Sequence, residues 1–152
     1  MTPAAANLIG SDEPISLALH GGATAPRRAR AAVLARLEHD LTDEQAADAI
    51  FIVSELVTNS VVHAHVSSDR SLTVELATAE DRLTIAVIDP GSTLEPHLTP
   101  ATGAMREQFG LFLVDALSVA WGFERDPVGR TRVWCELPRA PELPRAPIPL
   151  GP

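Results

Sequence analysis

One stretch, residues 50–66, constrains the fold more than any other part of this chain. It reads I-F-I-V-S-E-L-V-T-N-S-V-V-H-A-H-V, and at about 100° per residue it predicts a helix with one continuous apolar side. Such a side is typical of a helix that packs on a protein core. The residues expected on it, with the last two at its edge, are Ile50, Val53, Val57, Val61, Ala64, Leu56 and Ser60.

The opposite side of this helix mixes polar and apolar residues. Glu55, Asn59 and His63 follow one another at i, i+4 steps, and Phe51, Ile52 and Val62 lie among them. A helix that is apolar nearly all round is usually buried, and burial of an ionised carboxylate without a partner is costly. We therefore expect Glu55 to be paired, protonated, or facing a cavity that a polar ligand fills.

The segment E-L-V-T-N-S-V-V-H-A resembles the asparagine-bearing helix motif of the histidine-kinase-like (GHKL) ATPases. The closest branch is that of the bacterial anti-sigma factor serine kinases. The family's glutamate is a general base and its asparagine binds the magnesium on the triphosphate, so the resemblance implies these roles for Glu55 and Asn59. It also implies a place for His63 in the nucleotide-binding set. Without the resemblance, Glu55 and Asn59 form a polar pair capped by neighbouring loops, and His63 is a packing histidine.

A second motif follows a predicted buried strand, 83–88. Asp89-Pro90-Gly91 stands where the family has Asp-x-Gly-x-Gly, whose aspartate accepts a hydrogen bond from the adenine amino group. The resemblance implies that Asp89 and Gly91 bind the nucleotide, with Thr131 of a later strand near the aspartate. The alternative interpretation is an ordinary turn, for which Asp-Pro-Gly is a common sequence.

The family's second glycine motif falls on residues 108–110, Gln-Phe-Gly. By resemblance, Gly110 and Leu111 begin a helix whose free backbone amides cradle phosphates. Two positions depart from the family pattern, because Gln108 and Thr93 stand where glycines are expected. Glutamine adopts positive φ less readily than glycine, and a regulatory binding module with a degenerate ATP site, acting independently of nucleotide, remains the alternative function.

The composition favours a single soluble domain. The chain has 152 residues, 45% of them hydrophobic, and a formal net charge of -8 at pH 7, which suffices for one core and argues against direct binding to nucleic acid. No signal sequence or apolar run long enough for a bilayer is evident, so we expect a cytoplasmic protein without a membrane partner. One cysteine, Cys135, excludes an internal disulfide framework.

Hydrophobic periodicity and turn signals predict the order of the elements. We expect a disordered leader over 1–14, a domain over 15–137 and a Pro-rich disordered tail over 138–152. The domain is predicted to be an α+β two-layer sandwich of the Bergerat type, with helices on one face of a mostly antiparallel sheet. Its expected elements are strands over 15–19, 72–76, 83–88, 119–123 and 132–137, helices over 24–41 and from 42 onward, a turn at 81–82, a lid over 91–109 and a short helix from 110.

The resemblance also implies an activity and partners. These are ATP and Mg²⁺ as cofactors and serine/threonine kinase activity on a STAS-type anti-sigma factor antagonist. The family further implies sequestration of a sigma factor, usually by a homodimer, and therefore a role in transcription regulation.

Overall fold

The computed structural model describes residues 13–37, 39–91 and 112–139, which contain five strands, two long helices and a short helical segment over 112–117. The strands form one sheet in the order β1-β2-β3-β5-β4, and every neighbouring pair is antiparallel. The bounds are β1 (Ile15–His20), α1 (Ala25–Leu37), α2 (Asp43–His63), β2 (Ser71–Thr78), β3 (Arg82–Asp89), β4 (Ala120–Arg125) and β5 (Thr131–Pro138).

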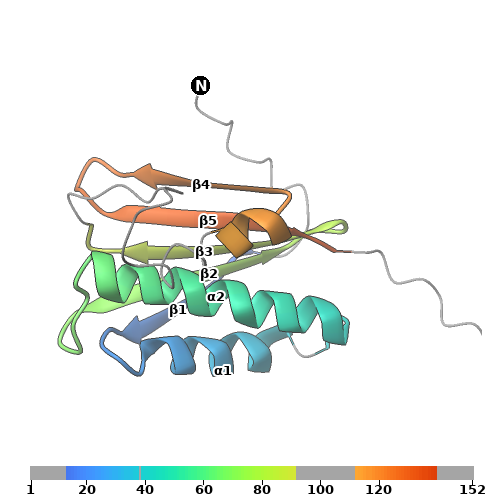
Figure 1. Ribbon diagram of the computed structural model, residues 1–152, viewed down its shortest axis with the longest axis horizontal. Helices are drawn as coiled ribbons and strands as arrows, with labels where there is room; N and C mark the ends of the chain where they lie inside the picture. The colour runs from blue at the N-terminus through green and yellow to red at the C-terminus, as the bar shows by residue number, and fades with distance from the viewer. Residues whose placement is uncertain (1–12, 38, 92–111, 140–152) are drawn as a thin grey trace, which may run out of the picture.

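The two long helices lie side by side on one face of the sheet (Figure 1). This arrangement is an α+β two-layer sandwich and confirms the predicted fold class. α2 contacts both α1 and β3, and Arg30 Nη1 of α1 donates a 2.7 Å hydrogen bond to Ser54 Oγ of α2. By length and composition α2 could cross a membrane, a test that core helices also pass; here it is the central helix of the packed layer.

The start of α2 follows from the local sequence. The Thr42 hydroxyl accepts a 3.2 Å hydrogen bond from the Gln45 amide, and the Gln45 side chain accepts one of 3.0 Å from the Thr42 amide. This reciprocal pair is a capping box, which satisfies two amides that lack intrahelical partners. Acidic Asp43 and Glu44 in the first turn also complement the helix dipole.

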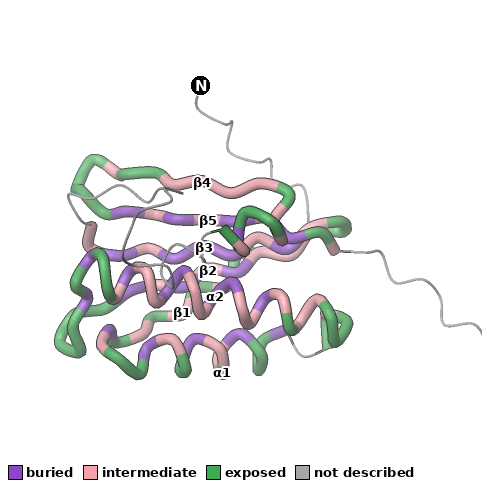
Figure 2. The backbone as a smooth tube through the Cα atoms, viewed as in Figure 1, coloured by how far each residue is buried: buried purple, intermediate pink, exposed green. Residues whose placement is uncertain are grey.

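The core lies between the helices and the sheet, where alternate strand residues point toward the helices. Figure 2 shows the buried positions concentrated along the central strands and the inner sides of the helices. On β3 and β5 the core side chains are Leu83, Ile85, Val87, Val133, Cys135 and Leu137.

The buried side of α2 differs from the predicted one. Ile50 and Val61 are only partly buried, whereas Ile52 is fully buried and Ser60, expected at the edge, is 4% exposed. Because α2 packs on a helix and on the sheet, its buried surface is wider than one stripe and rotated from the predicted axis. The buried residues within it are Ala49, Ile52, Val53, Leu56, Val57 and Ser60.

Several predicted boundaries are also wrong, including one in α1, one in β3 and one in β4. α1 ends at Leu37, not Leu41, because Thr42 takes the extended conformation of an N-cap (ψ 164°) and the chain must leave the helix before it. Arg82 belongs to β3 and not to the preceding turn, since the register pairs it with Pro138 of β5. β4 begins at Ala120, one residue after the predicted start.

The other face of the sheet carries charged side chains in place of a helical layer. Arg132 Nε lies 3.4 Å from Glu75 Oε2, and Arg82 Nη1 lies 2.8 Å from Glu136 Oε2. Ala86, which points to this face, is nevertheless completely buried, so the surrounding long side chains shield the centre of the sheet from water. We refer to this surface as the open face.

Candidate functional site

Asp89 is the last residue of β3 and one of three buried polar residues in the described part of the chain. It is 5% exposed and follows Leu83, Ile85 and Val87 on the helix-covered side of the strand. Oδ1 accepts a 2.8 Å hydrogen bond from the Gly91 amide. Within the described residues this is its one hydrogen bond, and its second carboxylate oxygen has no partner among them.

Thr131 lies directly opposite Asp89. The two residues are Cα partners in the β3–β5 ladder, and Thr131 is 4% exposed on the same side. Its Oγ1 is buried and lacks a hydrogen-bond partner within the described part of the chain. Because an unpaired buried hydroxyl costs about 1 to 3 kcal/mol, this oxygen indicates a place where a polar ligand group completes the structure.

Gly91 can only be glycine for two independent reasons. Its φ of 98° lies in the left-handed region, where a side chain is strained. A Cβ built on Gly91 would also overlap the carbonyl oxygen of Gly129. The turn after Asp89 is therefore packed closely against the turn between β4 and β5, and this packing places the Gly91 amide on the Asp89 carboxylate.

Glu55 lies in the fourth turn of α2 and is half-buried. No hydrogen bond or ion pair to another described residue involves it, and burial raises the pKa of its carboxyl above 4.5. No partner among the described residues neutralises the charge of this carboxylate. It fits the expectation of a group facing a polar ligand and is suited to accept a proton.

Asn59 and His63 follow Glu55 at successive turns of α2. Asn59 is half-buried and His63 is exposed at the end of the helix. Asn59 forms no hydrogen bond with another described residue, so its amide oxygen is available to a ligand. His63 has an interaction of its own and is not a core packing residue.

The two groups of residues lie toward the same end of the molecule. Figure 1 shows that α2 and β3 run in the same direction, so the end of α2 lies over the end of β3, where β5 begins. The structure thus brings the helix carrying Glu55 and Asn59 onto the face of the sheet that carries Asp89 and Thr131. Gly110 and Leu111, with the predicted lid and its departures at Thr93 and Gln108, lie outside the described residues.

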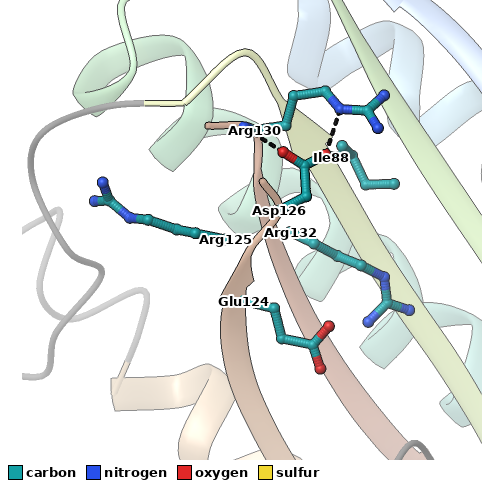
Figure 3. Close-up of a pocket in the computed structure, with 6 residues that line it drawn as sticks. All are labelled: Ile88, Glu124, Arg125, Asp126, Arg130 and Arg132. Carbon is teal, nitrogen blue, oxygen red and sulfur yellow. Dashed lines mark hydrogen bonds and ion pairs between the residues drawn. The ribbon is translucent and has the colours of Figure 1, made fainter. Parts of the chain in front are cut away.

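A partly open cavity of about 220 Å³ lies elsewhere, beside the turn between β4 and β5 (Figure 3). It is lined by Ile88, Arg132 and Glu124, which alternate with the helix-facing residues of their strands and so belong to the open face. This cavity is therefore distinct from the Asp89–Thr131 pair. Other lining residues are Arg125, Asp126 and Arg130.

Residues 21–134 match the family model of the histidine kinase-like ATPase domain. The match covers three quarters of the chain, from the end of β1 into β5, and includes both halves of the site. The chain therefore belongs to the histidine-kinase-like ATPase family. No curated protein matches it.

The described residues fit the adenine nucleotide that this family membership implies. Asp89 offers a buried acceptor for an amino group, and Thr131 offers a buried hydroxyl without another partner. Gly91 allows the backbone to approach closely without a side chain. For magnesium, no cluster of three His, Cys, Asp or Glu occurs among the described residues. The amide oxygen of Asn59 would be one ligand for an ion held mainly by phosphates and water.

The candidate site includes one contributor that the motifs do not predict, the Gly129 carbonyl that packs against Gly91. A pairing of two glycine-containing turns was the available signal, but only the strand order brings them together. The open-face cavity also could not be predicted from the sequence. Its arginines lie at strand ends and in a turn, and no motif indicates that they meet.

Proposed function

We propose that this protein is a serine/threonine protein kinase of the anti-sigma factor type. Its substrate would be a serine of a STAS-type anti-sigma antagonist, and its alternative partner a sigma factor. The observation that carries the proposal is the Glu55–Asn59 pair, half-buried and unpartnered among the described residues. A family member needs a polar helix of this kind to bind nucleotide and, in a kinase, to activate an acceptor hydroxyl.

Each side chain has a specific task in this proposal. Asp89 accepts a hydrogen bond from the adenine amino group, and the Thr131 hydroxyl satisfies its hydrogen bond with the bound base. Asn59 would hold magnesium through its amide oxygen. Glu55 accepts the proton of the substrate serine, and its pKa, raised by burial, brings it closer to the neutral range in which a general base works best.

Bound magnesium-ATP would supply the phosphoryl group and neutralise the charge that develops on it. The protein contributes position and a proton acceptor. Since the chain contains no Lys, phosphate contacts would come from backbone amides or arginines. A homodimer in the cytoplasm, acting in transcription regulation, completes the proposal.

The test is replacement of Glu55 by Gln, measured as transfer of labelled phosphate to a STAS-domain substrate. We expect at least a hundredfold loss of transfer, because general acid–base catalysis contributes about 10² to 10⁴ in rate, with unchanged nucleotide affinity. Glu44→Gln, an exposed position in the first turn of the same helix, is the matched control. Transfer by Glu55→Gln at the rate of the control would refute the assignment.

Stability gives a second measure of the same variant. Burial raises the pKa of Glu55, so this carboxyl favours folding in its protonated form, and its contribution is lost as pH rises above 4.5 through the folded pKa. At neutral pH, Glu55→Gln should therefore unfold at the same temperature as the wild type or higher. A lower unfolding temperature would show that Glu55 is a structural residue.

The alternative function is a regulatory binding module that does not depend on nucleotide. Its support is the substitution of two expected glycines by Thr93 and Gln108. The two functions differ in one property, which is whether the affinity for a partner changes between magnesium-ATP and nucleotide-free protein. A change supports the kinase, and equal affinities support the binding module.

A further inference from the structure

The open-face cavity differs in chemistry from the rest of this acidic molecule. Its volume of about 220 Å³ is below the range of about 300 to 1,000 Å³ for drug-sized ligands, so it suits a smaller group. Three arginines and two acidic residues line it, with Ile88 as the single apolar residue. The whole chain has a formal charge of -8, so three arginines around one small cavity are a local concentration of positive charge.

One of the two acidic side chains is already neutralised. Asp126 Oδ1 accepts hydrogen bonds from the amides of Val128 (3.1 Å) and Arg130 (2.9 Å), and Oδ2 lies 2.6 Å from Arg130 Nε. Asp126 therefore holds the turn and orients Arg130. It adds little negative charge that a ligand would meet.

Arg132 retains hydrogen-bond donors that no other described residue uses. Its Nε lies 3.4 Å from Glu75 Oε2, a long contact, and its two Nη groups form no hydrogen bond with another described residue. The side chain is one-third exposed. A guanidinium presents paired N–H groups in a fixed plane, which match the two oxygens of a carboxylate or phosphate.

We propose that this cavity is a binding site for a small oxyanion, a phosphate or a carboxylate, held by Arg132 with support from Arg130. Ile88 forms an apolar wall that lowers the local dielectric constant and strengthens the attraction. Glu124, which is exposed and opposite Arg132 in the β4–β5 ladder, opposes an anion and sets the limit on affinity.

The cavity lies directly behind the nucleotide site. Ile88 and Arg132 are Cα partners, and the next pair along the same two strands is Asp89 and Thr131. Because successive strand residues point to opposite faces, one pair faces the oxyanion and the next faces the nucleotide. Oxyanion binding itself does not depend on the proposed kinase function, so the two can fail separately.

The experiment is a titration of the full chain with inorganic phosphate, followed by backbone NMR shifts at constant ionic strength, since screening alters any exposed charge. We expect saturable shifts at Ile88, Glu124 and Arg132. Arg132→Gln should weaken binding about tenfold or more, because hydrogen bonds to charged groups are the strong ones. Arg36→Gln, an exposed arginine of α1, should leave affinity unchanged.

Two further variants decide whether the effect is local. Glu124→Gln removes the opposing charge and should tighten phosphate binding several-fold. Glu75→Gln removes the ion-pair partner of Arg132 but keeps the arginine, so binding should persist. Parallel titration with citrate distinguishes a carboxylate ligand from a phosphate ligand, the tighter of the two being the preferred class.

Three results would overturn the proposal. They are absence of saturable shifts with either anion, equal affinity in Arg132→Gln and Arg36→Gln, and loss of binding in Glu75→Gln to the extent seen in Arg132→Gln. The last would show that the ion pair supports the strand ends and that Arg132 contacts no ligand. Unchanged affinity in Glu124→Gln would place the anion elsewhere and count equally against the cavity.

Discussion

Gly91 connects the carboxylate of Asp89 to the turn between β4 and β5, and no other residue type suits its position. Its amide donates to Asp89 while its α-carbon packs on the carbonyl of Gly129. Both contacts need a left-handed φ and the absence of a Cβ. The orientation of the Asp89 carboxylate thus depends on a glycine two residues away.

Replacement of Gly91 by Ala should lower the free energy of unfolding by more than the approximately 1 to 2 kcal/mol of left-handed strain alone, because the new methyl group also overlaps Gly129. Gly129→Ala is the matched control, since its φ is 90° but a Cβ there meets no atom within 4 Å. Urea unfolding of both variants measures the difference. Equal losses would mean that the two turns do not pack as described.

The buried Thr131 hydroxyl has no hydrogen-bond partner among the described residues. Thr131→Val replaces an unpaired buried hydroxyl by a methyl group of similar size, so stability without nucleotide should rise by up to about 1 kcal/mol. Nucleotide affinity should fall, because valine cannot form the hydrogen bond proposed between the Thr131 hydroxyl and the bound base. Calorimetry and nucleotide titration test both signs, and a destabilised variant with normal affinity would contradict this role.

The motifs predict candidate site residues, but not the state of their side chains. Asp89 and Thr131 could be placed together by resemblance, whereas the missing partner of Thr131 depends on every side chain packed around it. The same holds for the raised pKa of Glu55, which results from burial by distant elements. Arg132 could not be predicted at all, because alternation alone does not say which arginines meet at a strand end.

At the scale of elements, α2 is defined at its beginning by its own sequence and along its length by its neighbours. The capping box is formed by residues within one turn, so sequence was sufficient to predict it. The buried side of the helix was predicted less well. Contacts with α1 and β3 together determine which residues of α2 are buried. The hydrophobic periodicity of α2 alone does not predict these contacts.

Thr42→Ala should destabilise the protein by about 1 kcal/mol, the usual cost of losing an N-cap, which lowers the unfolding temperature by about 2 to 4 °C in a domain of this size. Gln45→Ala should cost less. The double variant should cost less than the sum, because the two hydrogen bonds are reciprocal. Strict additivity in thermal unfolding would contradict a coupled capping box.

For the whole molecule, the layer architecture was predictable and the strand order was not. Alternating and apolar segments predict five strands and their inner faces, but β5 lies between β3 and β4, and that order comes from contacts between distant residues. The strand order matters for the proposed nucleotide site. It places Thr131 beside Asp89 and the β4–β5 turn beside Gly91.

It also places the two proposed sites back to back across one sheet. If both are occupied as proposed, a ligand at either site contacts the same strand ends, and any effect on affinity must be reciprocal. Such coupling would connect the charged open face to the nucleotide state of the helix-covered face.

The central claim is a working adenine-nucleotide site at Asp89 and Thr131, and thermal unfolding with added nucleotide tests it most directly. Magnesium-ATP at about 100 times its dissociation constant should add roughly 2.7 kcal/mol to the free energy of unfolding. GTP should add little, because guanine presents a carbonyl where adenine has its amino group, and Asp89→Asn should remove the ATP effect. An unfolding temperature that does not change with millimolar magnesium-ATP, or an Asp89→Asn variant that responds as the wild type does, would contradict the account.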